Sequence, residues 1–344
     1  MKVETVTSAQ NPKIKDLLAL QEKSRLRRER GLFAVEGQRE LGHCLNAGFV
    51  PETLFICGEV IAANEQRSTS FIHWGTYPPD PLRSKLRCSV NHRGTYPPDP
   101  LPPLGASTQD NANAANTNTQ RHFDKLSDRS ANIEGKDGLE ALVARAEALN
   151  PKLLLVQLPA FLYEKVAYRG STEGVIGVMR SRELSLSDLA VGENPLIVVL
   201  EGVEKPGNLG AVLRSADAAG ADAVLLCDPL TDLYNPNLIR SSIGAVFTAP
   251  VVCCTSAEAI AWLKEHSIRI YTAQLQDSSL YYDCPMTGGT AIAIGTEATG
   301  LSDEWREAAD AHIRIPMEGK LDSLNASVSA AILLYEAVRQ RNSK

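Results

Sequence analysis

The sequence predicts an α/β protein with a C-terminal parallel sheet and a smaller N-terminal α/β domain. From Pro195 onward, continuous apolar runs alternate with amphipathic helical segments, which is typical of a parallel sheet covered on both faces. The 344 residues are enough for two domains of ordinary size. We expect a first domain at 1–182, a linker at 183–194 and a second domain at 195–344.

The N-terminal domain is expected to mix helices and strands on both sides of an interruption. Before it we expect a helix around Ile14–Leu20, the apolar run FAVEG at 33–37, a helix at Arg39–Ala47 and a strand TLFIC at 53–57. After it we expect a helix at 138–149 and strands at 152–158 and 175–180.

The interruption, about 65–135, is unlike a packed domain. The run GTYPPDPL at 75–82 returns at 94–101, and the stretch at 109–120 has no large apolar side chain. Such composition buries too little surface to offset chain entropy. We interpret it as a disordered insert, with a proline-rich docking segment as the alternative.

The C-terminal domain is predicted to alternate strands and helices to its end. Strands are expected at 195–203, 221–228, 249–254, 268–275, 291–297 and 312–316, and helices at 207–220, 235–245, 256–266 and 323–341. The last helix carries apolar residues at helical spacing, namely Leu324, Val328, Ile332, Tyr335 and Val338.

Composition argues against a disulfide-bonded, metal-binding, secreted or membrane-spanning protein. The seven cysteines contain no CxxC pair, so we expect reduced thiols, and the six histidines form no HxxxH or HExxH motif, so we expect no metal site. The first residues lack the apolar stretch of a signal peptide, and no apolar run approaches the ~20 residues that span a bilayer. We expect a cytoplasmic protein without a membrane segment.

One segment is basic although the chain has a net charge of −6. Residues 11–30 hold seven Lys and Arg against three Asp and Glu, a local net charge of 7 − 3 = +4. Phosphate contacts require such a strip, and we expect Lys23, Arg25, Arg27, Arg28 and Arg30 to contact the phosphates of a nucleic acid. The alternative is a merely solvated helix face.

Three polar segments carry the candidate chemistry. The first, VLEGVEKPGNLGAVLRSAD, is a strand, a Gly/Pro/Asn turn and a helix, which favours an anion at the helix N-terminus. A dinucleotide-binding fingerprint is the competing interpretation, because Asp228 closes the next strand; however, Lys205 stands where that motif needs glycine.

The other two segments also follow predicted strands. Glu297 lies at the C-terminal end of one strand, where open sheets bind ligands, and a Gly-containing turn follows it. Ser323 and Asn325 begin the last helix, so helix capping is the alternative for one of them.

The ordered combination of these segments closely resembles the SpoU (TrmH-like) class of RNA ribose methyltransferases, in the SPOUT superfamily. The resemblance rests on KPGNLGAVLRSADAAG, NPNLIRSSIGAVF, IGTEATGLS and IPMEGKLDSLNASVSAAILLYEAVRQ, and covers 195–341. The segment from SAQNPKIKDL to GQREL resembles the ribosomal-protein-like substrate-binding domain of these enzymes, and LYEKVAYRGSTEGVIGVM resumes it. Ala298 departs from the glycine of many relatives.

The resemblance implies a deep trefoil knot in the C-terminal domain, an obligate homodimer and S-adenosylmethionine (SAM) as methyl donor, with no metal. The implied reaction is methylation of a ribose 2′-hydroxyl in RNA, with ribosomal RNA favoured over transfer RNA. Carried over by position, the catalytic set is Asn208, Arg214, Glu297, Ser323 and Asn325. The cofactor set is Gly295, Gly300, Ile315 and Leu324, and Arg240 is placed near RNA.

Arg214 is expected to clamp an RNA phosphate and to stabilise the developing alkoxide, because guanidinium stays protonated in proteins. Glu297 is expected to orient Arg214 or a backbone amide. Two other functions stay open: a non-catalytic RNA-binding assembly factor of the same fold, and a nicotinamide-dependent oxidoreductase.

Overall fold

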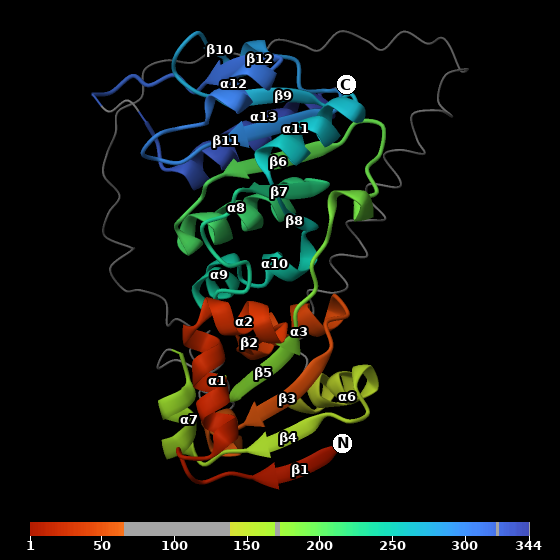
Figure 1. Ribbon diagram of the computed structural model, residues 1–344, viewed down its shortest axis with the longest axis vertical. Helices are drawn as coiled ribbons and strands as arrows, with labels where there is room; N and C mark the ends of the chain where they lie inside the picture. The colour runs from red at the N-terminus through yellow and green to blue at the C-terminus, as the bar shows by residue number, and fades with distance from the viewer. Residues whose placement is uncertain (65–137, 169–172, 321–322, 344) are drawn as a thin grey trace, which may run out of the picture. The chain divides into compact units, whose positions relative to one another are not determined.

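A computed structural model describes residues 1–64, 138–168, 173–320 and 323–343 of the chain (Figure 1). The predicted insert at 65–135 lies outside these residues. The segments Met1–Ala63 and Asp137–Lys344 belong to one compact unit, and the proposed boundaries at 182 and 195 stay a prediction. None of the helices in the described ranges combines the length and the apolar character that a membrane span requires.

The N-terminal segments form a five-stranded mixed sheet in the order β1-β4-β3-β5-β2. Its strands are β1 (Lys2–Thr5), β2 (Leu32–Glu36), β3 (Pro51–Ile56), β4 (Leu154–Gln157) and β5 (Val175–Arg180). Strand β4 pairs in parallel with β1 and β3, whereas β5 pairs antiparallel with β3 and β2. Segments on both sides of the insert therefore build one sheet.

The helices of this region include α1 (Pro12–Glu22), α2 (Ser24–Arg30), α3 (Gln38–Asn46), α6 (Leu139–Leu149) and α7 (Ala160–Val166), and residues 58–64 are helical as well. Helix α1 begins where the Asn11 side chain accepts a hydrogen bond from the Lys13 amide and Pro12 occupies the first turn. It buries Ile14, Leu17 and Leu20, as its periodicity predicts. Strand β1, largely exposed, and the short helix α7 have no clear periodicity, and the sequence did not predict them. Helix α2 carries part of the basic strip, for which a helix face was one of the two interpretations.

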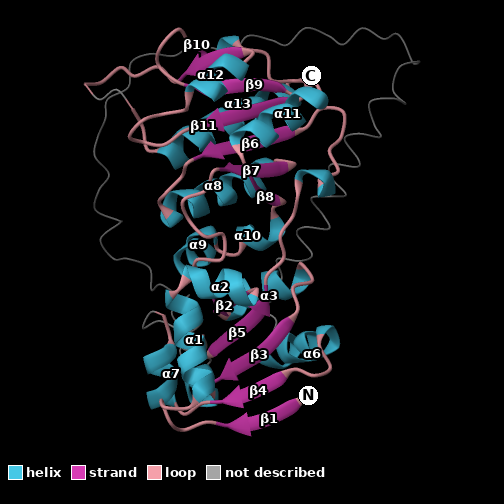
Figure 2. Ribbon diagram, in the orientation of Figure 1, coloured by secondary structure: helices cyan, strands magenta, loops and turns pink. Residues whose placement is uncertain are grey.

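The C-terminal segments form a seven-stranded sheet in the order β10-β12-β9-β11-β6-β7-β8 (Figure 2). Its strands are β6 (Leu196–Glu201), β7 (Ala223–Cys227), β8 (Val251–Cys254), β9 (Arg269–Ala273), β10 (Ser279–Leu280), β11 (Thr290–Ile294) and β12 (Ala311–Arg314). All six pairings are parallel, and β7 and β11 are buried throughout. The predicted parallel sheet is confirmed.

The helices of this region are α8 (Pro206–Ala219), α9 (Pro236–Ser242), α10 (Ala245–Thr248), α11 (Ser256–Glu265), α12 (Asp303–Ala308) and α13 (Ala326–Asn342). Helix α11 begins with a capping box, in which the side chains of Thr255 and Glu258 bond each other's backbone amides. The short β10, α10 and α12, and the 3₁₀ turns at Leu186–Asp188 and Tyr281–Asp283, were not predicted.

Helix α13 forms as predicted, but its apolar stripe does not face the core. The buried apolar residues are Ala330, Leu333, Leu334 and Ala337. Val328 and Tyr335 of the predicted stripe are 46% and 49% exposed. The spacing identified the helix but not its buried side, because the stripe continues around a helix that is apolar on more than one face.

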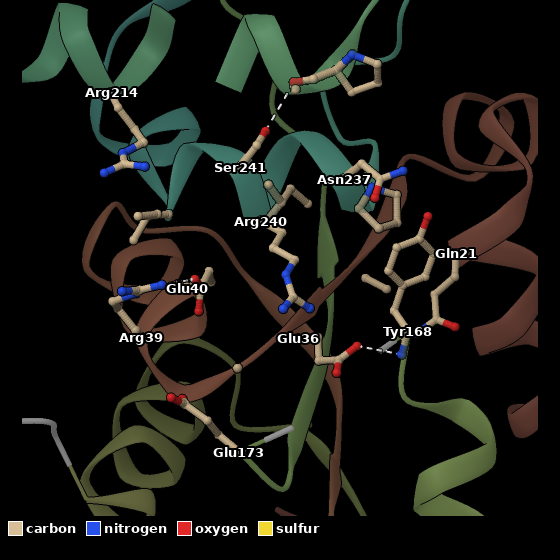
Figure 3. Close-up of a pocket in the computed structure, with 17 residues that line it drawn as sticks. Gln21, Glu36, Arg39, Glu40, Tyr168, Glu173, Arg214, Asn237, Arg240 and Ser241 are labelled. Atoms are coloured by element: carbon tan, nitrogen blue, oxygen red, sulfur yellow. Dashed lines mark hydrogen bonds and ion pairs between the residues drawn. The ribbon is translucent and has the colours of Figure 1, made fainter. Parts of the chain in front are cut away.

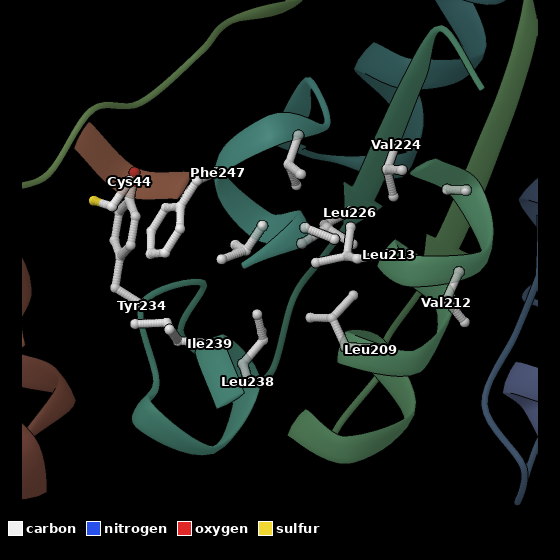
Figure 4. Packing of buried hydrophobic residues seen from close by; sticks show 14 of the residues in the cluster. Cys44, Leu209, Val212, Leu213, Val224, Leu226, Tyr234, Leu238, Ile239 and Phe247 are labelled. Carbon is white, nitrogen blue, oxygen red and sulfur yellow. The ribbon is translucent and has the colours of Figure 1, made fainter. Parts of the chain in front are cut away.

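The hydrophobic core between α8, α9 and β7 holds the first polar segment in place. Leu209 and Leu213 of α8 and Leu238 and Ile239 of α9 are buried in one cluster (Figure 4). The ring of Phe33 in β2 stacks on Tyr234 with centroids 4.1 Å apart. Helix α8, which carries Asn208 and Arg214, therefore packs against buried side chains of α9.

Candidate active site

Three side chains from the three polar segments are hydrogen-bonded to one another. Asn208 lies in the first turn of α8, Glu297 follows β11, and Asn325 precedes α13. The Nδ2 groups of Asn208 and Asn325 each donate to Glu297 Oε1 at 2.9 Å. Asn325 Nδ2 also donates to Asn208 Oδ1 at 3.1 Å. We call Asn208, Glu297 and Asn325 the polar cluster.

A lysine completes the charge balance of the polar cluster. The ammonium of Lys205, the residue before α8, forms an ion pair with Glu297 Oε2. This hydrogen bond lowers the pKa of the Glu297 carboxyl, with a further contribution from Asn208, and it raises the pKa of Lys205. Both groups stay charged near neutral pH. In the sequence, Lys205 stands out only as a departure from a glycine motif. Its ion pair with Glu297 was not predicted.

Asn325 both caps α13 and joins the polar cluster. Its Oδ1 accepts hydrogen bonds from the Ser327 amide at 3.0 Å and the Ser327 hydroxyl at 2.6 Å, while its Nδ2 serves Glu297 and Asn208. The capping interpretation is therefore confirmed for Asn325, and its part in catalysis stays a prediction. The helix start fixes the amide orientation that the cluster uses.

The predicted cofactor residues Ile315 and Leu324 line one small cavity together with Ser323. Its other walls are the C-terminal ends of β9 and β12 and one side of α13, with residues Ala273, Gln274, Leu275, Ile313, Arg314, Met317, Ser329 and Leu333. The cavity has a volume of about 140 Å³. That is below the few hundred Å³ usual for a whole ligand. Contact of Ile315 and Leu324 with a cofactor stays a prediction.

Gly295 and Gly300 form a tight turn beside Glu297. A Cβ at Gly295 would lie 2.1 Å from the carbonyl carbon of Gly300, so any larger residue would force the backbone apart. The Thr296 and Gly300 backbones exchange hydrogen bonds of 3.2 and 3.1 Å, and Gly300 has a φ of 71°. Steric need accounts for both glycines, and their contact with the cofactor stays a prediction.

Arg214 lies on the exposed side of α8 and lines a larger cavity of about 710 Å³, which Arg240 of α9 also lines (Figure 3). The hydrogen bonds that Glu297 accepts come from Lys205, Asn208, Asn325 and the backbone of Ala326. Of the two roles expected of Glu297, the described contacts match the orientation of a backbone amide, not that of Arg214.

The basic strip in α2 needs one correction. Arg27 is 3% exposed; its Nε donates to Asp232 at 2.5 Å, and its Nη1 donates to the carbonyls of Leu20 and Gln21. It is therefore a buried structural residue and is not available to RNA. The other predicted contacts, Lys23, Arg25, Arg28 and Arg30, are exposed. In the described residues, no group of three His, Cys, Asp or Glu is arranged to hold a metal ion.

A parallel sheet with polar residues from three segments gathered beyond its strand ends defines a class of ligand-binding α/β proteins. Residues 195–335 match the model of the SpoU rRNA Methylase family, and residues 11–74 match the MRM3-like substrate binding domain. Over 179 residues the chain is 37% identical to the 23S rRNA (guanosine-2′-O-)-methyltransferase RlmB of Xylella fastidiosa (strain 9a5c), covering 51% of this chain and 72% of that protein. The chain belongs to the SpoU rRNA methylase family.

The name of a second relative refers to uridine, whereas RlmB is named for guanosine. The chain is 34% identical over 193 residues to the 23S rRNA (uridine(2479)-2′-O)-methyltransferase of Streptomyces viridochromogenes, covering 54% of this chain and 67% of that protein. Solved structures extend the similarity beyond the family model. A crystal structure of an RNA 2′-O ribose methyltransferase is 31% identical, with a TM-score of 0.64, and covers 98% of this chain and 99% of that one.

The structure of AviRb from Streptomyces viridochromogenes in complex with AdoMet has a TM-score of 0.67 at 23% identity, covering 97% of this chain and 99% of that one. At this identity the likeness is one of fold alone. The resemblance inferred from the motifs is confirmed.

Proposed function

We propose that the protein transfers a methyl group from SAM to a ribose 2′-hydroxyl of ribosomal RNA. The observation that carries this proposal is the polar cluster, in which side chains from three separated family motifs bond one another beside the helix that bears Arg214. Relatives named for methylation of 23S rRNA favour ribosomal over transfer RNA as the substrate.

The cavity beside Ser323, Ile315 and Leu324 would hold the cofactor. When bound, SAM supplies an electrophilic methyl group. This chain's residues then have to place the ribose oxygen in line with that group, and such positioning accounts for a large share of the rate in reactions of this kind. The polar cluster serves this purpose, because its hydrogen bonds lock the starts of α8 and α13 and the loop after β11 together.

The ribose hydroxyl has to lose a proton as the new bond forms. Glu297 is poorly suited to accept it, because hydrogen bonds from Lys205, Asn208 and the Ala326 amide lower the pKa of its carboxyl. The proton therefore passes to solvent water. Arg214 holds a phosphate and stabilises negative charge on the oxygen, as a fixed cation at the site of developing charge does. Glu297, Asn208 and Asn325 act as positioning residues.

We also propose that the working form is a homodimer with a knotted C-terminal region that acts on RNA in the cytoplasm. Support for the dimer comes from α13, where Val328 and Tyr335 lie seven residues apart and are half exposed. Apolar side chains so placed suit burial against a second copy. Light scattering should give the mass of two chains, and Val328→Asp should shift the protein to monomer; a monomeric wild-type protein would contradict the dimer.

The reaction is tested by incubating the full chain with methyl-labelled SAM and unmodified rRNA transcripts, followed by alkaline hydrolysis. Methylation of a 2′-hydroxyl removes the nucleophile for hydrolysis, so the label should appear in alkali-stable dinucleotides. Label in mononucleotides would indicate base methylation and would overturn the proposal. Binding of RNA without any transfer would support the non-catalytic assembly factor.

A further inference from the structure

The larger cavity has walls of opposite charge. One wall, from α8 and α9, presents the guanidinium groups of Arg214 and Arg240. The other, from β2, α3 and the segment before β5, presents the carboxylates of Glu36, Glu40 and Glu173 together with the guanidinium of Arg39, which pairs with Glu40, so this wall keeps a net negative charge (Figure 3). A nucleotide has the complementary polarity, because its phosphate is an anion and its base edge carries N–H donors. The volume of about 710 Å³ lies within the range of ligand pockets.

The three carboxylates differ in how they are engaged. Glu40 forms an ion pair with Arg39 at 2.7 Å, and Glu173 accepts a hydrogen bond from the Gln38 amide at 2.6 Å at the start of α3. Glu36 is the last residue of β2, and its Oε2 accepts a hydrogen bond from the Tyr168 amide at 2.7 Å. A carboxylate has about four acceptor positions, so this bond leaves acceptor capacity on Glu36.

The surroundings of Glu36 make additional donors favourable. Burial raises the pKa of its carboxyl, while the Tyr168 amide and the charge of Arg240 lower it. A half-buried carboxylate gains stability from each further N–H group that reaches it. In Figure 3 the Arg240 side chain extends from α9 toward Glu36, and the Tyr168 ring lies beside Gln21 on the same side of the cavity.

We propose that Glu36 reads the base of the nucleotide to be methylated and selects guanine; this inference rests on the proposed function. The Watson–Crick edge of guanine presents two adjacent donors, N1–H and one hydrogen of the N2 amino group, to which a carboxylate can bond with both oxygens. Uracil flanks its one donor with two carbonyl oxygens, and adenine and cytosine pair a donor with a ring-nitrogen acceptor. Each of these acceptors would face a negative charge.

The remaining lining residues suit a base turned out of its stack. Unstacked bases in RNA are held on aromatic rings or guanidinium planes and are read on their Watson–Crick edge. Tyr168 and Arg240 offer such surfaces next to Glu36. Arg214, in the same cavity, then lies on the phosphate side of the nucleotide, which agrees with its proposed role in the reaction.

The first test identifies the methylated nucleoside. Unmodified rRNA transcripts are methylated with labelled SAM and digested completely to nucleosides, which are separated by chromatography. The label should be in 2′-O-methylguanosine. Label in the uridine, adenosine or cytidine product would overturn this inference and leave the proposed function standing, whereas absence of label would overturn the proposed function and this inference with it.

The second test examines the proposed hydrogen bond between Glu36 and the N2 amino group of guanine. A transcript with inosine at the mapped target lacks only the N2 amino group, and the wild-type protein should methylate it about 10- to 100-fold less efficiently, the loss typical of one hydrogen bond to a charged group. Glu36→Gln should lower kcat/KM on guanosine by a similar factor and should discriminate little between guanosine and inosine. Glu164→Gln, an exposed carboxylate of α7, is the matched control and should behave as wild type. Equal rates on guanosine and inosine with the wild-type protein would contradict the contact, whether or not the Glu36 variant folds.

Discussion

Arg27 and Arg214 carry the same group in opposite surroundings. Arg27 is 3% exposed, and Asp232 and two backbone carbonyls accept hydrogen bonds from its guanidinium. Arg214 is exposed and lines the larger cavity. The first arginine ties α2 to a loop 205 residues away in sequence, whereas the second faces the larger cavity. The difference shows that partner and burial, not residue type, decide whether an arginine is accessible to a ligand.

The largest effect is expected for Arg27→Ala. Removing one partner of a buried ion pair leaves the 9% exposed Asp232 without its counter-charge, which costs about 3–5 kcal/mol. Denaturant unfolding monitored by circular dichroism measures this. Arg25→Ala, in the same helix but with a side chain that is 87% exposed, is the control and should change stability by less than about 1 kcal/mol. Equal stabilities of the two variants would contradict the structural role of Arg27.

Next comes Arg214→Ala, which should lower kcat about 10²- to 10³-fold, the usual loss for one group that stabilises developing charge. The variant should unfold at the wild-type denaturant concentration and bind SAM normally. Arg214→Lys keeps the charge but not the planar fork, so it should recover only part of the rate. Full activity of Arg214→Ala would refute its assignment.

A smaller effect separates the two roles of Asn325. Asn325→Asp keeps the oxygen that caps α13 but replaces the donor with a carboxylate oxygen that Glu297 and Asn208 repel, so the polar cluster should open and activity should fall while the cap remains. Asn325→Ala loses the cap as well and should be destabilised by about 1 kcal/mol. Thermal unfolding and the methyl-transfer assay distinguish them. Wild-type activity in the Asp variant would show that the polar cluster has no part in the reaction.

The smallest effect is expected in the exposed basic strip. Arg28→Ala should weaken RNA binding only a few-fold and should reduce the slope of log affinity against log salt by about 0.7–0.9, as the loss of one phosphate contact does. Filter binding across a salt series gives this slope. The free energy of unfolding should not change, in contrast to the variant at Arg27 one position earlier. An unchanged slope would show that Arg28 makes no phosphate contact.

The sequence predicted those features that depend on local pattern. The apolar runs at 195–203 and 221–228 contain β6 and β7, and the strand-end and helix-start patterns point to Glu297 and Asn325. Asn208 is identified only by the resemblance to the SpoU class, and it bonds the same carboxylate. Features that depend on distant partners were missed. The burial of Arg27 depends on Asp232, and the inclusion of Lys205 depends on Glu297, 92 residues away. Short elements such as β1 and α12 have too few residues to show a period.

The proposed reaction requires that the C-terminal region bind a sulfonium methyl donor. Isothermal titration of the full chain with SAM measures this binding, with nicotinamide dinucleotide as the competing ligand. We expect saturable binding of one SAM per chain, displacement by S-adenosylhomocysteine and no heat with the dinucleotide. Absence of SAM binding, or binding of the dinucleotide in its place, would contradict the proposed reaction.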